Sequence, residues 1–242
     1  MLKIDTHIVI SNYFTDPEYY VNLTNNYTIY DQTTDAEIAK LIQIKYPEVV
    51  QTMNTGHNIS DYLKFIIENY DDLPEWMMFA KGNMVGRHIT LDYFERVYKN
   101  KIYTNLFHEE NLIDKQDLAY YLFEGAYIER NNSWYMNTKE HNYVHTYNQM
   151  LSLIYKKPIY PEYIIFSPGC CTILSKNNIL INTKEMYINL KKLVSYKYFP
   201  AEAYIIERMF HTLMHSKAEK NELINNVENF NKYIEEINQN KK

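Results

Sequence analysis

The sequence predicts an α/β fold with a mixed, mostly parallel sheet flanked by helices. Short apolar runs of strand length alternate with segments whose apolar residues recur at helical spacing. The run "EWMMFA" at 75–80 is nearly continuous in hydrophobicity, as a strand buried on both faces of a sheet should be. Because strands that alternate with helices favour parallel pairing through right-handed crossovers, we expect a Rossmann-like sheet.

The first half of the chain carries the clearest alternation. "HIVIS" at 7–11 is a β-branched apolar run and predicts a buried strand. Asp16 as a helix N-cap and Pro17 at the first helical position predict a helix over "DPEYYVNL". The next predicted elements are a strand at 27–31, a helix at 35–46, a strand at 48–53, a helix at 60–70 and a strand at 75–80.

The second half has a looser pattern. Residues 100–160 are polar, aromatic and irregular, and after them the sequence predicts a strand at 168–175 and helices at 183–196 and 201–215. We interpret the whole chain, 1–242, as a single domain. Its parts are a nucleotide-type half at 1–100, a second half at 101–216 and a C-terminal helix at 217–242.

The C-terminal segment has a short heptad pattern. Its apolar residues recur at spacings of 4 and 3 and are Leu223, Val227, Phe230, Ile234 and Ile237. Two heptads are too few to identify a coiled coil. A helix that packs on its own domain and a homodimer contact therefore both remain open.

Composition excludes several classes of protein. The 242 residues are 46% hydrophobic and 23% charged, which is typical of a globular protein. The net charge of −5 and the lack of a basic tract argue against a general nucleic-acid binder. No apolar run reaches ~18 residues and no signal peptide is evident, so we expect no membrane span and a cytoplasmic location. The adjacent Cys170 and Cys171 suit no ordinary disulfide, which favours a reducing compartment.

Polar residues and glycines follow the first four predicted strands. They are Ser11 and Asn12, Asp31, the run Asn54-Thr55-Gly56-His57, and the run Lys81-Gly82-Asn83. In a parallel sheet these positions lie on one edge, where open α/β sheets bind ligands. The chain has only 5 glycines, and two of them stand at these strand ends, where a side chain would be in the way. The sequence thus predicts a binding crevice there.

The stretch "NTGHNISDYLKFIIENYDDLPEWMMFAKGN" at 54–83 resembles the signature of a glycosyltransferase-like family of fungi, bacteria and large viruses, much of it long uncharacterised. The later "PGCCTILSKNNIL" and "AYIIERMFH" resemble the second and third blocks of that family. The layout is also similar to GT-A glycosyltransferases in general. The resemblance implies a GT-A-like fold and an inverting transfer of a sugar from a nucleotide-sugar donor to a glycan or lipid-linked acceptor such as a glycolipid.

The resemblance also implies roles for the residues at the strand ends. Those implied to face or adjoin the nucleotide are Ser11, Asn12, Asp31, Asn54, Gly56 and His57. The turn formed by Lys81, Gly82 and Asn83 would lie under the diphosphate.

The same turn departs from the GT-A pattern, in which an Asp-x-Asp holds a divalent metal. Lys81 and Asn83 occupy the positions of the two carboxylates that a hard cation prefers. Either Asn83, a distant acid or histidine and the phosphates hold Mn²⁺ or Mg²⁺, or Lys81 supplies a fixed positive charge instead. The departure also favours an alternative, a non-catalytic protein that binds a nucleotide-sugar or a glycan.

An inverting transfer needs a base, usually a carboxylate near the anomeric carbon. Glu202 is our candidate, because inverting GT-A enzymes commonly supply the base from the start of a late helix. A carboxylate at that position also stabilises a helix through its dipole, so a structural role is equally open. Glu207 and Arg208, deeper in the same helix, are expected to form a buried structural pair.

Two further groups of residues are candidates for binding. His211 and His215 share a helix face at a spacing that can hold a metal, although no third ligand is evident. The irregular stretch at 100–160, with Trp134, Tyr135 and many amides, is where we expect contacts with an acceptor.

Overall fold

The computed structural model describes residues 3–108, 121–123 and 125–241. Within them, six strands form the main sheet in the order β3-β2-β1-β4-β9-β5. Their bounds are β1 His7–Asn12, β2 Tyr27–Asp31, β3 Val50–Gln51, β4 Trp76–Lys81, β9 Thr172–Ser175 and β5 Thr104–Asn105. The first four strands pair in parallel, whereas β9 runs antiparallel to both β4 and β5. The mixed, mostly parallel, Rossmann-like sheet is therefore confirmed.

The strand order reverses at β1. The chain continues from β1 outward to β2 and β3, then returns to place β4 on the other side of β1. Ser11 pairs with Lys81 across β1 and β4, and Asn12 pairs with Asp31 across β1 and β2. This topological switch point brings the ends of β1 and β4 together at the edge where such sheets bind ligands.

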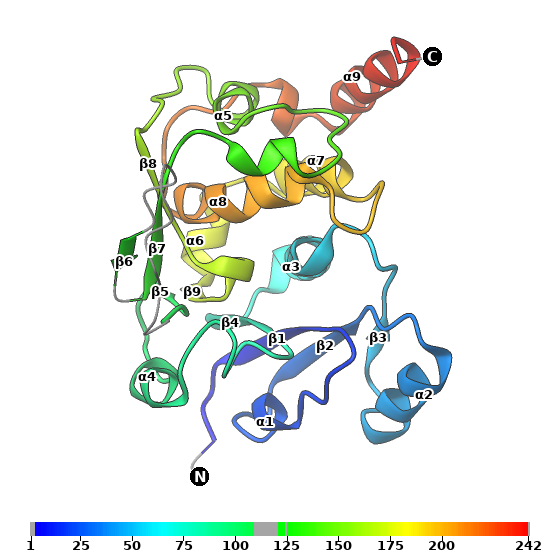
Figure 1. Cartoon of the computed structure of the whole chain (residues 1–242), viewed down its shortest axis with the longest axis vertical. Coiled ribbons are helices and arrows are strands. Elements are labelled where there is room, and N and C mark those ends of the chain that lie inside the picture. Colours follow the sequence, from blue (N-terminus) through cyan, green and yellow to red (C-terminus); the bar gives the residue numbers. More distant parts are fainter. Residues whose placement is uncertain (1–2, 109–120, 124, 242) are drawn as a thin grey trace.

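Helices cover both faces of the main sheet (Figure 1). On one face lie α3 (His57–Asn69), α7 (Lys184–Val194) and α8 (Ala201–His215), and on the other α1 (Glu18–Val21), α2 (Ala36–Lys45) and α4 (Leu91–Val97). Val9 and Phe79 belong to the core on the first side, and Ile8 and Ile10 to the core on the second. Because β1 and β4 are buried on both faces, their sequences are continuously apolar.

The second half adds a small antiparallel sheet that the sequence did not predict. It joins β6 (Tyr121–Phe123), β7 (Ala126–Arg130) and β8 (Tyr163–Phe166). The remaining helices are α5 (Tyr147–Ile154), α6 (Lys176–Leu180) and α9 (Val227–Gln239). None of the helices in the described part of the chain is long and apolar enough to cross a membrane.

Several predicted boundaries are wrong. The strand predicted at 48–53 is limited to Val50–Gln51, and the helix predicted at 60–70 begins at His57. The strand expected at 168–175 begins only at Thr172, because Gly169 and Cys170 adopt left-handed φ values of 72° and 52° within a short 3₁₀ turn. In α1 the N-cap is Pro17 rather than Asp16, although the Asp16 carboxylate still accepts a hydrogen bond from the Glu18 N–H.

The C-terminal heptad pattern contributes to the core of the chain itself. Phe230 of α9 is fully buried, and Leu223 and Ile234 pack against the same core. Asn226 caps α9 by accepting a hydrogen bond from the Asn229 N–H, and Lys192 of α7 donates to Asn231. Packing on its own domain thus accounts for the apolar seam. A homodimer contact stays a prediction.

Candidate functional site

Two adjoining cavities open at the carboxyl edge of the main sheet, beside the switch point. We call the first, of about 280 Å³, the edge cavity; its lining residues are Ser11, Tyr13, Thr15, Gln32, His57, Asn58, Lys81, Gly82, Asn83, Arg87, Tyr198 and Phe199. The second, of about 300 Å³, is the aromatic cavity; its walls include Tyr127, Trp134, Phe166, Tyr204, Glu207 and Arg208. Both cavities share His57, Lys81, Arg87 and Phe199 as lining residues.

Two cations stand where the cavities meet. Lys81 ends β4, and Arg87 follows in the next turn. Neither side chain forms a hydrogen bond or ion pair with another residue in the described ranges. Burial and the charge of Arg87 lower the pKa of Lys81, partly offset by the charges of Cys171 and Glu207. No aspartate or glutamate in the described ranges lines the edge cavity, so this cavity is suited to an anion.

His57 contributes shape rather than charge. Gly56 and His57 both have left-handed φ values, 69° and 53°, and their N–H groups donate to the carbonyls of Lys197 and Tyr198 at 2.8 and 2.9 Å. The imidazole stacks on Phe199 with ring centroids 4.3 Å apart. Burial and the positive charge of Lys81 lower the pKa of His57 to about 3, so the ring is neutral at physiological pH.

The two strand-end glycines leave room for neighbouring side chains. A Cβ on Gly56 would lie 2.9 Å from both Ser60 Cβ and Val194 Cγ2. A Cβ on Gly82 would lie 2.3 Å from Asn12 Oδ1 and from Thr15 Oγ1. Gly82 does line the edge cavity, whereas Gly56 does not.

Asn12 and Asp31 lie beneath the cavity surface. Both are fully buried, and Asn12 Nδ2 donates to Asp31 Oδ1 at 3.0 Å. Thr33 Oγ1 donates to the same oxygen at 2.7 Å, and Gln51 Nε2 to the other at 3.1 Å. Asn12 and Asp31 therefore join the ends of β1, β2 and β3 and are not among the residues that line the edge cavity. Asn54, also expected near the nucleotide, is not among them either.

A buried carboxylate that the sequence analysis missed organises the floor of the edge cavity. Asp61 of α3 accepts hydrogen bonds from Ser11 Oγ at 2.6 Å, Gln32 Nε2 at 2.9 Å and Thr52 Oγ1 at 3.0 Å. Burial raises its pKa to about 6 against the lowering effect of these hydrogen bonds. The only available signal was an acid on the inner face of a helix otherwise lined by Tyr62, Phe65 and Ile66.

The aromatic cavity contains a carboxylate beside an ion pair. Arg208 holds the buried Glu129 in a two-pronged contact, Nε to Oε1 at 2.7 Å and Nη2 to Oε2 at 2.8 Å. Its guanidinium also lies over the rings of Tyr135 and Phe166, at 4.1 and 4.6 Å from their centroids. Arg208 thus has two carboxylate partners. The predicted Glu207 pairs with it at 3.2 Å, and Glu129, which the sequence did not indicate, holds it in the two-pronged contact.

Glu207 lies at the wall of this cavity. Its Oε2 accepts a hydrogen bond from Arg208 Nη1 at 3.2 Å, and its Oε1 accepts one from the Gly169 N–H. The side chain keeps 15% of its exposure. Burial raises the pKa of Glu207, opposed by the neighbouring charge of Arg208. A carboxylate whose basicity is increased, next to Trp134 and Tyr204, is suited to accept a proton from a bound hydroxyl group.

Glu202 has a different place from the one that we expected for a catalytic base. Its side chain is fully buried. Oε1 accepts hydrogen bonds from the N–H groups of Asn142 and Tyr143, both at 2.7 Å, and Oε2 accepts one from Tyr196 Oη at 2.7 Å. Glu202 therefore ties the loop at 142–143 to the start of α8, and it lines neither cavity.

The candidate metal ligands do not assemble into a metal site. Asn83 lines the edge cavity without a carboxylate beside it, and His211 stacks on His215 at 4.4 Å outside both cavities. Among the residues that the structure describes, no group of three or more His, Cys, Asp or Glu side chains could hold a metal ion. The described residues that line the edge cavity thus do not fit Mn²⁺ or Mg²⁺.

The predicted acceptor stretch is partly placed. Trp134 lines the aromatic cavity, and Tyr135 is buried beneath the Arg208 guanidinium. Residues 109–120 of that stretch lie outside the described residues.

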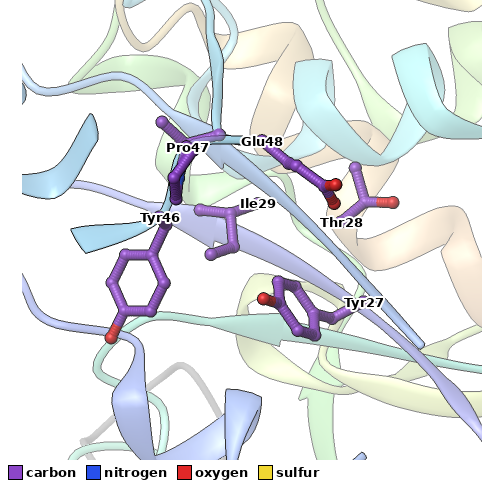
Figure 2. A pocket seen from close by; sticks show the side chains of 7 residues that line it. Tyr27, Thr28, Ile29, Tyr46, Pro47 and Glu48 are labelled. Atoms are coloured by element: carbon purple, nitrogen blue, oxygen red, sulfur yellow. The ribbon is translucent and has the colours of Figure 1, made fainter. Parts of the chain in front are cut away.

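A further cavity of about 410 Å³ lies at the beginning of β2 (Figure 2). Tyr27, Ile29 and Tyr46 line it together with Glu48, and Figure 2 shows the Glu48 carboxylate near Thr28. No lysine or arginine is among its lining residues. Because it lies at the amino end of β2, it is separate from the switch point.

A family model described as "Protein of unknown function (DUF3431)" matches residues 24–226 of the chain. No curated protein and no solved structure matches it. The matched segment includes β4, Arg87, Asp61 and the whole of α8.

Proposed function

The chain belongs to the family described as "Protein of unknown function (DUF3431)", and for it we propose a glycosyltransferase that binds a nucleotide-sugar at the switch point of its sheet. The observation that carries the proposal is the pair of adjoining cavities: one is lined by two cations that form no ion pair with a described residue, and the other contains Glu207. A transferase needs such a division, because donor and acceptor must meet at one reacting carbon.

The edge cavity is the proposed donor site. Lys81 and Arg87 supply positive charge at its boundary with the aromatic cavity, where the diphosphate would lie. Ser11, Gln32 and Asn58 offer hydroxyl and amide groups around it, and Tyr13 offers an exposed ring. The switch-point position of the cavity is the usual ligand site of an open α/β sheet.

The aromatic cavity is the proposed acceptor site, and Glu207 is the proposed base. The acceptor hydroxyl would give its proton to the Glu207 carboxylate while its oxygen forms a bond to the anomeric carbon of the donor. The bond from that carbon to the phosphate oxygen would break, and the nucleoside diphosphate would leave beside Lys81 and Arg87. Attack from the face opposite the phosphate inverts the anomeric configuration. The aromatic walls, which include Tyr127, Trp134 and Tyr204, suit a glycan or glycolipid acceptor.

A second candidate function is binding of a nucleotide-sugar or glycan without catalysis. The run Lys81-Gly82-Asn83 favours it, because carboxylates are missing where GT-A enzymes hold their metal. The presence of Glu207, whose pKa is raised within the adjoining cavity, favours the transferase.

The proposal includes a cytoplasmic location. Cys170 and Cys171 are both free and buried, as thiols in a reducing compartment would be.

A thermal-shift screen of the full chain against nucleotide-sugars tests the proposal. A specific donor at 100 times its dissociation constant should stabilise the folded state by about 2.7 kcal/mol and raise the melting temperature. Each stabilising donor is then incubated with glycan and glycolipid acceptors, and the products are analysed for sugar transfer. Stabilisation with transfer supports the enzyme, and stabilisation without transfer supports the binding protein. If no nucleotide-sugar changes the melting temperature, the transferase and the binding of nucleotide-sugars are both contradicted, and only glycan binding is left.

A further inference from the structure

We propose that Lys81 and Arg87 bind the diphosphate of the donor directly, in place of a divalent metal ion. The inference rests on the proposed function, since it concerns the same cavity. It adds that Lys81 and Arg87 recognise the diphosphate and that this binding needs no metal ion.

Lys81 is a partly desolvated cation that forms no ion pair with a described residue. Eight other lysines in the described ranges pair with an acid within 4.0 Å: Lys45, Lys64, Lys101, Lys156, Lys176, Lys184, Lys197 and Lys232. The charge of Glu207 acts on Lys81 without forming such a pair. A partly desolvated cation without an ion pair is costly, and an anionic ligand in the cavity would reduce that cost.

Gly169 leaves space for the aliphatic stem of Lys81. A Cβ on Gly169 would lie 2.7 Å from Lys81 Cδ, and Gly169 has a left-handed φ of 72°. Asn58 Nδ2 and Glu207 Oε1 form hydrogen bonds to the carbonyl and the N–H of Gly169, so the turn is held from both sides. The turn at Gly169 is therefore fixed, and it directs the Lys81 side chain toward the cavities. A solvated surface lysine would not need such a turn.

Arg87 brings a second positive charge to the same place. Its charge lowers the pKa of Lys81, of His57 and of His88, so it lies close enough to all three to repel a proton. Burial and these neighbours lower the pKa of both histidines to about 3, which leaves them uncharged. Lys81 and Arg87 are thus the charged groups offered to a ligand in the edge cavity, and two ionised phosphate groups would match them.

The same surroundings do not suit a hard cation. Mg²⁺ and Mn²⁺ bind through carboxylate oxygens, and the described lining of the edge cavity contains none. Two fixed positive charges would also repel a metal ion. A diphosphate bound directly by the ammonium and guanidinium groups matches the charges of the cavity, whereas a diphosphate bridged by a metal ion does not.

The test measures the affinity of the full chain for inorganic pyrophosphate and for nucleoside diphosphates by calorimetry, in excess EDTA and in Mn²⁺. We expect binding in EDTA at least as tight as in Mn²⁺. Lys81→Ala and Arg87→Ala should each weaken it by roughly ten-fold or more, the range for losing a charge-assisted contact. Lys81→Arg should retain most of the affinity, and the exposed Lys217→Ala, which removes the same charge elsewhere, should leave it unchanged.

Melting temperatures distinguish a ligand-binding lysine from a structural one. Lys81→Ala without ligand should melt at the wild-type temperature or above it, because it removes an unpaired buried cation. Binding that requires Mn²⁺, unchanged affinity in Lys81→Ala, or no binding of any probe overturns the inference. Metal-free binding without sugar transfer would leave the inference standing and contradict the transferase. Sugar transfer that EDTA abolishes would support the transferase and contradict the inference.

Discussion

Ser11 Oγ donates a 2.6 Å hydrogen bond to Oδ2 of Asp61, so the end of β1 is fixed to the second turn of α3. The same carboxylate accepts from Gln32 after β2 and from Thr52 after β3. One buried acid thus sets the relative positions of three strand ends on which the edge cavity depends. No lysine or arginine in the described ranges forms an ion pair with it, and the nearest cation acting on it is Lys191 of α7.

Replacing Asp61 by alanine should weaken ligand binding and destabilise the fold together. The change removes the acceptor of the buried Ser11 hydroxyl, of one N–H of the buried Gln32 amide and of the half-buried Thr52 hydroxyl, and each unsatisfied buried group costs about 1–3 kcal/mol. We expect urea unfolding to show a loss of at least ~2 kcal/mol and nucleotide affinity to fall. The exposed Asp72→Ala is the matched control. Unchanged affinity in Asp61→Ala would show that Asp61 does not position the cavity.

Asp61 should also make the stability of the protein depend on pH. Its folded-state pKa, about 6, lies above the ordinary 3.8, so the folded state binds the proton more tightly. The stability that proton binding to Asp61 contributes is therefore fully present below pH 3.8 and is lost as the pH rises through about 6. Tyr30 of β2 and Lys191 of α7 also interact with this carboxylate. Burial and the charge of Glu68 raise the pKa of Tyr30, and burial lowers the pKa of Lys191.

The comparison that isolates this effect uses Asp61→Asn, which has a similar shape and no titrating proton. The difference in free energy of unfolding between wild type and Asp61→Asn should shift against the wild type by on the order of 2 kcal/mol between pH 4 and 6 and stay level from pH 6 to 8. A difference that does not vary across pH 4–6 would contradict the raised pKa.

Gly169→Ala should impair the site without removing a charge. The new Cβ would press on the Lys81 stem and would sit in a left-handed backbone conformation, which costs a residue with a side chain about 1–2 kcal/mol. Nucleotide affinity should therefore fall along with stability. Gly86→Ala is the control, because Gly86 has a similar φ of 84° and its Cβ would meet nothing within 4 Å. Equal affinities in the two variants would show that the Lys81 stem needs no such space.

Glu202→Ala should destabilise the protein rather than slow its chemistry. The substitution removes the acceptor of the Asn142 and Tyr143 N–H groups and of the Tyr196 hydroxyl. A loss of about 2–4 kcal/mol in unfolding free energy is expected, with turnover of the remaining folded protein close to wild type. If folded Glu202→Ala binds donor normally but transfers no sugar, Glu202 is catalytic after all.

Much of the sheet could be predicted from the sequence, because its signals are local. The continuous hydrophobicity of β1 and β4 follows from burial on two faces, and the polar residues after them indicated the correct edge. The second sheet could not be predicted, since β7 and β8 pair across more than 30 residues that include helix α5. Its strands are short, and only half of the β8 residues are buried.

The sequence indicated where the candidate site lies, but not the roles of its individual residues. Ser11, His57, Lys81 and Gly82 line the edge cavity, whereas Gly56 does not. The atoms that a Cβ on either glycine would meet belong to neighbouring side chains, which the sequence did not indicate. The spacing along α8 could not tell which glutamate faces a cavity. Which glutamate faces a cavity depends on Glu129, which lies in the unpredicted second sheet and forms an ion pair with Arg208.

The central claim is that Glu207 removes the acceptor proton in a sugar transfer, and the transfer rate of Glu207→Gln tests it most directly. The rate of sugar transfer from a donor found in the screen is measured for wild type and variant, with donor affinity measured in parallel. Glutamine keeps the size of the side chain and cannot accept the proton, so the rate should fall by ~100-fold or more while donor affinity stays within about two-fold. Transfer by Glu207→Gln at the wild-type rate would contradict the account.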